Sequence, residues 1–106
     1  MIKKAVAIYL RGEKQEQQLE LCQEYVRLYL GEAVENCLIF QDEGSLAEEL
    51  PGLQSLMAAV NRNVLHTVVC SDIGVICKNT AELVETVRQL ESKDTALILV
   101  KNQQHF

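Results

Sequence analysis

Apolar positions along the chain follow one spacing in some segments and a different spacing in others. Residues 2–10 form a continuous β-branched and apolar run that ends in charge, which is typical of a buried strand. Between residues 13 and 30 the apolar side chains instead fall three to four positions apart, with Glu and Gln between them. This spacing predicts an amphipathic helix, which Gly31 would close at its C′ position.

The two spacings continue to alternate to the end of the sequence. The further predicted elements are a strand at 37–40, a turn at 42–45, a helix from Pro51 to 61–63, a strand at 64–70, a less regular stretch at 71–78, a helix that Asn79 and Glu82 begin as a capping box, and a strand at 95–100. Strands that alternate with helices in this way are typical of a parallel sheet covered by helices on both faces. Ligand sites in such folds lie where the strands end, here after residues 10, 40 and 70.

Length and charge narrow the class of protein. The 106 residues suit a single domain, 1–106, whose core needs no metal or disulfide. The net charge is −5 and the ten Lys and Arg residues are spread along the chain, so we expect weak or no DNA binding by the chain alone. No stretch reaches the roughly 18–20 continuous apolar residues of a membrane helix, and residues 1–12 lack a signal-peptide cleavage site. We therefore expect a cytoplasmic protein with no membrane contact.

The sequence offers no recognisable cofactor or metal site. The cysteines adjoin apolar runs without any CxxC spacing, which favours free, reduced thiols at Cys22, Cys37, Cys70 and Cys77. The turn after the first strand has one glycine, Gly12, and so is not a phosphate-binding loop. Because that strand ends in Arg11, the acidic cluster of a phosphoacceptor receiver domain is also missing.

Four segments resemble, in order and spacing, the motifs of the catalytic domain of serine recombinases, the resolvases and invertases. They are AIYLR at 7–11, QLELCQEY at 18–25, DEGS at 42–45 with LPGLQ at 50–54, and the stretch 68–79. In the family they correspond to a strand ending in Tyr-x-Arg, the first helix, an Asp-Glu-Gly loop with an Arg-Pro-Gly-Leu helix start, and an Asp-Arg-Leu-Ser-Arg-Asn motif. The resemblance implies a resolvase-like, three-layer α/β/α fold with a parallel four-stranded sheet in the order 2-1-3-4.

The nucleophile of the family is missing from this sequence. Family members attack a phosphodiester with a serine that stands two residues after the arginine of Tyr-x-Arg, where this chain has Glu13. Residues 12–18 contain no Ser, Thr or Tyr at all. A carboxylate in place of the serine opposes phosphate binding, because like charges roughly 4 Å apart repel by about 4 kcal/mol at an effective dielectric of about 20.

The arginines that would stabilise the phosphate are mostly replaced as well. The arginine of Arg-Pro-Gly-Leu is Leu50, and the Asp-Arg pair of the last motif is Gly74 and Val75. The last arginine is Lys78, which keeps the charge but not the two-pronged grip of a guanidinium on phosphate. The sequence therefore indicates a degenerate domain that is not an enzyme.

Four residues remain from the family site: Tyr9, Arg11, Asp42 and Lys78. Structural roles compete with a retained ligand role for most of them. Arg11 and Asp42 could form an ordinary ion pair at the sheet edge, and Tyr9 could be a core residue on a buried strand.

Other residues with catalytic potential also have plain structural interpretations. His66 lies in an apolar strand with no candidate partner in the sequence, and His105 belongs to a short tail at about 101–106. Cys77 stands where the family has a small polar residue, and a chance replacement is favoured over a reactive thiol. Ser45 and Ser71 are the hydroxyls that could serve as a displaced nucleophile.

Two hypotheses from different classes follow. The first is a catalytically inactive, resolvase-like interaction or regulatory module, partnered by a second copy or by an intact recombinase, and derived from a mobile element. The alternative is a residual serine recombinase whose catalytic residues are displaced. Family members continue into a long helix and a separate DNA-binding domain, whereas we expect no DNA-binding domain in residues 1–106.

Overall fold

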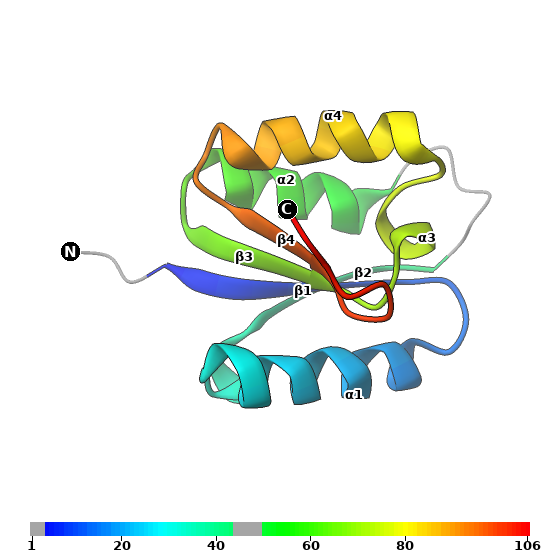
Figure 1. Ribbon diagram of the computed structural model, residues 1–106, viewed down its shortest axis with the longest axis vertical. Helices are drawn as coiled ribbons and strands as arrows, with labels where there is room; N and C mark the ends of the chain where they lie inside the picture. Colours follow the sequence, from blue (N-terminus) through cyan, green and yellow to red (C-terminus); the bar gives the residue numbers. More distant parts are fainter. Residues whose placement is uncertain (1–3, 44–49) are drawn as a thin grey trace.

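A twisted sheet with helices on both faces makes up the molecule (Figure 1). The computed structural model describes residues 4–43 and 50–106. In chain order the elements are β1 (Ala5–Arg11), α1 (Gln15–Tyr25), the π-helical turn η1 (Val26–Leu30), the 3-10 turn η2 (Val34–Asn36), β2 (Leu38–Asp42), α2 (Pro51–Asn61), β3 (Leu65–Cys70), α3 (Ile73–Ile76), α4 (Thr80–Glu91), β4 (Ala96–Leu99) and β5 (Gln104–His105).

The predicted sheet is confirmed, with one strand added. The strands lie in the order β2-β1-β3-β4-β5; β1 to β4 are parallel, and β5 runs antiparallel to β4. Residues 101–106 are therefore not the tail that we expected. Gln103, at φ 52°, lies in a tight turn after Val100, and the backbones of Leu97 and Phe106 then exchange two hydrogen bonds of 3.0 and 2.8 Å.

Single residues in the sequence predicted most of the helix ends correctly. Gly31 ends the first helical segment in the left-handed region at φ 63°, and Pro51 is the first residue of α2. Asn79 caps α4 by accepting a hydrogen bond of 2.9 Å from the backbone N–H of Glu82. The predicted start at residue 13 is wrong: α1 begins at Gln15, because the preceding Lys14 adopts φ 60°. The stretch 71–78, predicted to be irregular, contains the short helix α3.

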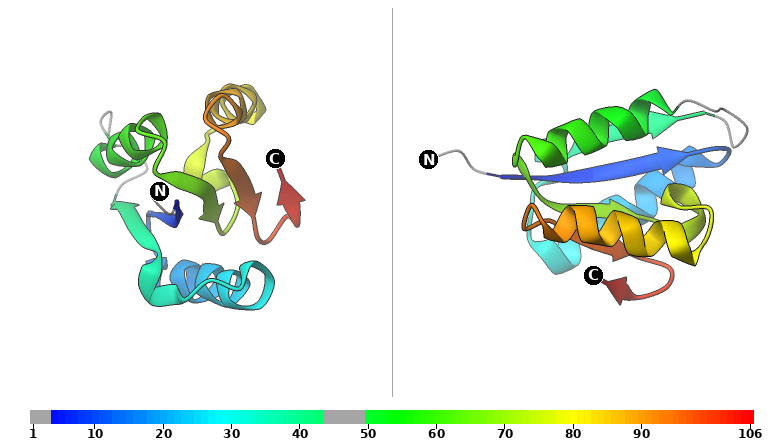
Figure 2. Two further views of the ribbon diagram at one scale, coloured as in Figure 1. Left: turned by 90° about the vertical axis from the view of Figure 1, so that its left-hand side faces the viewer. Right: turned by 90° about the horizontal axis from the view of Figure 1, so that it is seen from above.

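Two apolar clusters sandwich the sheet, one on each face. The cluster beneath α2, α3 and α4 includes Tyr9, Leu56, Val60, Val68, Leu83, Leu97 and Leu99, and the cluster beneath α1 includes Ile8, Leu10, Cys22, Val26, Val69 and Ile98. Figure 2 shows α2 and α4 together on one face and α1 alone on the other. Because β1 lies inside the sheet, between β2 and β3, with buried side chains on both faces, its sequence is a continuous apolar run.

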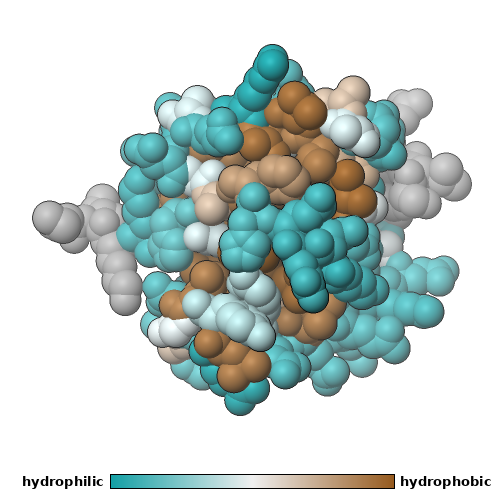
Figure 3. Space-filling view, in the orientation of Figure 1, coloured by the Kyte–Doolittle hydropathy of each residue, from teal (hydrophilic) through white to brown (hydrophobic). Residues whose placement is uncertain are grey.

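The face drawn in Figure 3 is hydrophilic around most of its rim, with hydrophobic side chains gathered toward its middle. The large hydrophobic residues with substantial exposure are Leu28, Tyr29, Leu38, Ile39, Val84 and Phe106. Within residues 4–43 and 50–106, no helix is long and apolar enough to cross a membrane.

Candidate functional site

The carboxyl ends of β1, β2 and β3 bring most of the predicted site residues to one edge of the sheet. Tyr9 and Arg11 come from β1, and Arg11 is paired in register with Asp42, the last residue of β2. The segment that follows β3 begins with Ser71 and Asp72. This edge includes the gap between β1 and β3, where the order of the strands reverses and where α/β proteins place their ligands.

Asp42 is buried and fully engaged by neighbouring groups. Its Oδ2 accepts hydrogen bonds from the Tyr9 hydroxyl at 2.5 Å and from the Leu53 backbone N–H at 2.8 Å. Its Oδ1 accepts one from the Gly52 backbone N–H at 2.7 Å. Since these two N–H groups belong to the first turn of α2, Asp42 caps that helix from the neighbouring strand.

Gly52 explains why the start of α2 can approach β2 so closely. A Cβ atom at this position would lie 2.2 Å from the Gln41 carbonyl oxygen, so a larger side chain would push the helix away from the strand. The Pro-Gly-Leu segment and Asp42 thus form a packing unit that holds α2 on the sheet. This part of the family motif has a structural purpose whether or not the chain catalyses a reaction.

Tyr9 belongs to the core, as the structural interpretation proposed. Its side chain is fully buried, and burial together with the hydrogen bond to Asp42 raises its pKa far above the usual value. The hydroxyl therefore stays protonated and acts as a donor.

Arg11 is held by contacts other than the ion pair with Asp42 that we considered. Its Nη2 donates to the Gly74 carbonyl oxygen at 3.1 Å, which ties the end of β1 to α3. Among the described residues, the ion pairs shorter than 4.0 Å do not include Arg11 with Asp42. The ion-pair interpretation is thus wrong, because Asp42 is turned toward α2 and Tyr9.

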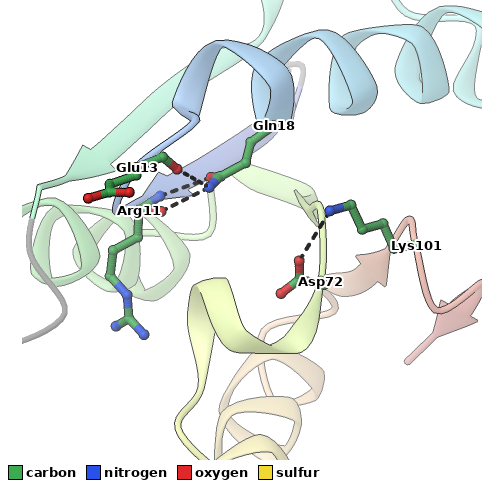
Figure 4. Close-up of polar contacts among 5 residues, drawn as sticks. All are labelled: Arg11, Glu13, Gln18, Asp72 and Lys101. Atoms are coloured by element: carbon green, nitrogen blue, oxygen red, sulfur yellow. Dashed lines mark hydrogen bonds and ion pairs between the residues drawn. The ribbon is translucent and has the colours of Figure 1, made fainter.

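Two glutamines in the first turn of α1 bind the backbone of the turn after β1, and our interpretation of the sequence missed them. The Gln18 side chain accepts from the Arg11 backbone N–H at 3.1 Å and donates to the Arg11 and Glu13 carbonyl oxygens at 2.9 and 3.1 Å (Figure 4). Gln15 donates to the carbonyl oxygens of Gly12 and Asp42 at 3.0 and 2.9 Å. Both looked like ordinary polar positions of a helix, so spacing alone gave no signal for this role.

The Glu13 side chain is exposed at the mouth of this turn. Figure 4 shows its carboxylate and the Arg11 guanidinium directed away from each other, while the Gln18 amide reaches the backbone of both residues. Across the gap, Asp72 and Lys101 form an ion pair of 3.8 Å. The edge therefore carries both charges, and the described residues contain no group of three side chains suited to hold a metal ion.

Comparison with known proteins gives the family of the chain. The family model for the resolvase N-terminal domain matches residues 6–106. The chain belongs to the resolvase N-terminal domain family. None of the curated proteins matches it significantly.

Solved structures of recombinases share the fold of this resolvase domain. The N-terminal catalytic domain of TP901-1 integrase superposes with a TM-score of 0.79 at 17% identity, over 96% of this chain and 81% of that one. The C-terminal catalytic domain of ISC1926 TnpA, an IS607-like serine recombinase, gives 0.75 at 20% identity, over 92% and 70%. A resolvase family site-specific recombinase from Streptococcus pneumoniae gives 0.74 at 14% identity, over 97% and 76%.

Lys78 lies apart from the other remnants of the recombinase pattern. Its side chain is exposed just before α4, and its backbone N–H donates to the Glu82 carboxylate at 2.6 Å. Within the described part of the chain its ammonium group forms no ion pair shorter than 4.0 Å. Val75, which stands where the resolvase pattern has arginine, is buried in the core.

The structure describes one of the two serines that we considered as displaced nucleophiles. Ser71 is completely buried at the end of β3, and its hydroxyl has no hydrogen-bond partner within the described residues. A hydroxyl sealed from solvent cannot reach a DNA phosphate in this conformation. Ser45 lies outside the described residues.

The histidines have partners that the sequence did not reveal. His66 Nε2 lies 3.5 Å from a Glu32 carboxylate oxygen, and its Nδ1 lies 2.8 Å from the Thr67 hydroxyl. His105, expected in a tail, is part of β5, with its Nε2 2.8 Å from the Tyr25 hydroxyl. Neither histidine contacts the Arg11 edge of the resolvase domain.

All four cysteines are free, as predicted: Cys22, Cys37, Cys70 and Cys77. Cys37 is half-buried and the other three are buried. Burial raises the pKa of each thiol and brings that of Cys22 to about 12. Because the thiolate is the reactive form, the raised pKa of Cys77 argues against a reactive thiol at that position.

Proposed function

We propose that this resolvase domain leaves DNA strands intact and works through its surface, as a protein-interaction or regulatory module. The observation that carries the proposal is the end of β1, where Glu13 stands in place of the expected serine and the amides of Gln15 and Gln18 bind the backbone of the turn. Strand cleavage needs an accessible nucleophile and positive charge around the phosphate. Among the described residues, Glu13 stands in place of the serine, and Leu50 and Val75 stand where the family pattern has arginines.

The degeneration is concentrated in the residues of catalysis and spares those of folding. Asp42 and Gly52 keep their packing role at α2, and Tyr9 keeps its place in the core. The same fold can host different functions, so the fold alone does not imply the family's chemistry.

A cleavage assay tests the loss of activity. Purified protein is incubated with supercoiled plasmid and stopped with detergent, and an active serine recombinase serves as the positive control. We expect no nicked plasmid and no protein covalently attached to DNA. A covalent adduct would overturn the proposal, and its absence from the Ser45→Ala variant would then identify a displaced nucleophile.

The partners we propose are a second copy of the chain or an intact recombinase. Co-expression of the tagged domain with an active recombinase, followed by a pull-down, tests the second partner. Light scattering across a concentration series tests the first. If no complex forms and the mass stays monomeric at all concentrations, both named partners are excluded.

A further inference from the structure

We draw no further inference here: the strongest candidate, the apolar groove between α1 and β4–β5, carries none because nothing in residues 4–43 and 50–106 shows what covers it.

Discussion

At the scale of single residues, three of the four side chains that match the recombinase pattern make hydrogen bonds within the fold: Tyr9, Arg11 and Asp42. Asp42 shows this most clearly, since its two oxygens accept three hydrogen bonds from β1 and α2. Arg11 likewise donates to a backbone carbonyl of α3. A residue can therefore match a catalytic motif in the sequence while its functional groups are occupied by the fold.

Replacing Asp42 tests this role. Asp42→Ala leaves the buried Tyr9 hydroxyl and two N–H groups of α2 without a partner, so we expect a loss of about 2–4 kcal/mol in the free energy of unfolding. Tyr9→Phe removes one donor and leaves the cap intact, and it should cost only about 1 kcal/mol. Urea unfolding followed by circular dichroism measures both values. An equal or smaller cost for Asp42→Ala would show that the cap is unimportant.

At the scale of elements, the decisive contact is the close approach of α2 to β2. Pro51 fixes the first helical residue, Gly52 provides the space, and Asp42 supplies the acceptors. At the other end of the chain, β5 covers the edge of β4, which would otherwise be open. The first feature joins a helix to a strand through side-chain contacts, and the second involves a strand whose sequence shows no clear alternation of apolar and polar residues.

A comparison of two glycines tests the contact between α2 and β2. Gly52→Ala places a methyl group against the Gln41 carbonyl oxygen, and we expect a loss of about 2–4 kcal/mol because the helix must shift. Gly31→Ala meets no atom within 4 Å and suffers only from its positive φ, with an expected cost of about 1 kcal/mol. Denaturant unfolding gives the two free-energy losses, from the shift of the midpoint when the m-value is unchanged. The interpretation fails if Gly31 proves the more sensitive position.

At the scale of the whole molecule, the resolvase fold carries a negative net charge, from which we expect weak or no DNA binding. The net charge is −5, and the ten Lys and Arg residues are spread along the chain. Affinity for DNA comes largely from neutralised phosphates.

Binding to duplex DNA tests this conclusion directly. We expect no change in the anisotropy of a labelled duplex up to about 100 μM protein at roughly 150 mM salt. Such a result would mean that the chain binds DNA more weakly than typical non-specific DNA-binding proteins do. The Glu13→Ser variant should behave in the same way, because it restores a hydroxyl but none of the missing arginines. Binding that weakens steeply with added salt would instead reveal a phosphate contact that the charge distribution does not suggest.

The sequence by itself determined the alternation of strands and helices, the cap at Asn79, the ends at Gly31 and Pro51, and the family resemblance. These features depend on local spacing and on the conformational preferences of individual residues, which can be evaluated without the fold. The absence of a hydroxyl between residues 12 and 18 was also evident in the sequence alone.

Only the tertiary structure decided what the remaining polar groups do. The bonds of Gln18 to the end of β1, of Arg11 to Gly74, and of Asp42 to α2 depend on atoms that the fold brings together across the chain. The same holds for β5, because its pairing with β4 depends on the turn that follows Val100. Local pattern determines the elements, whereas the pairing of side chains and the exposure of faces are properties of the assembled molecule.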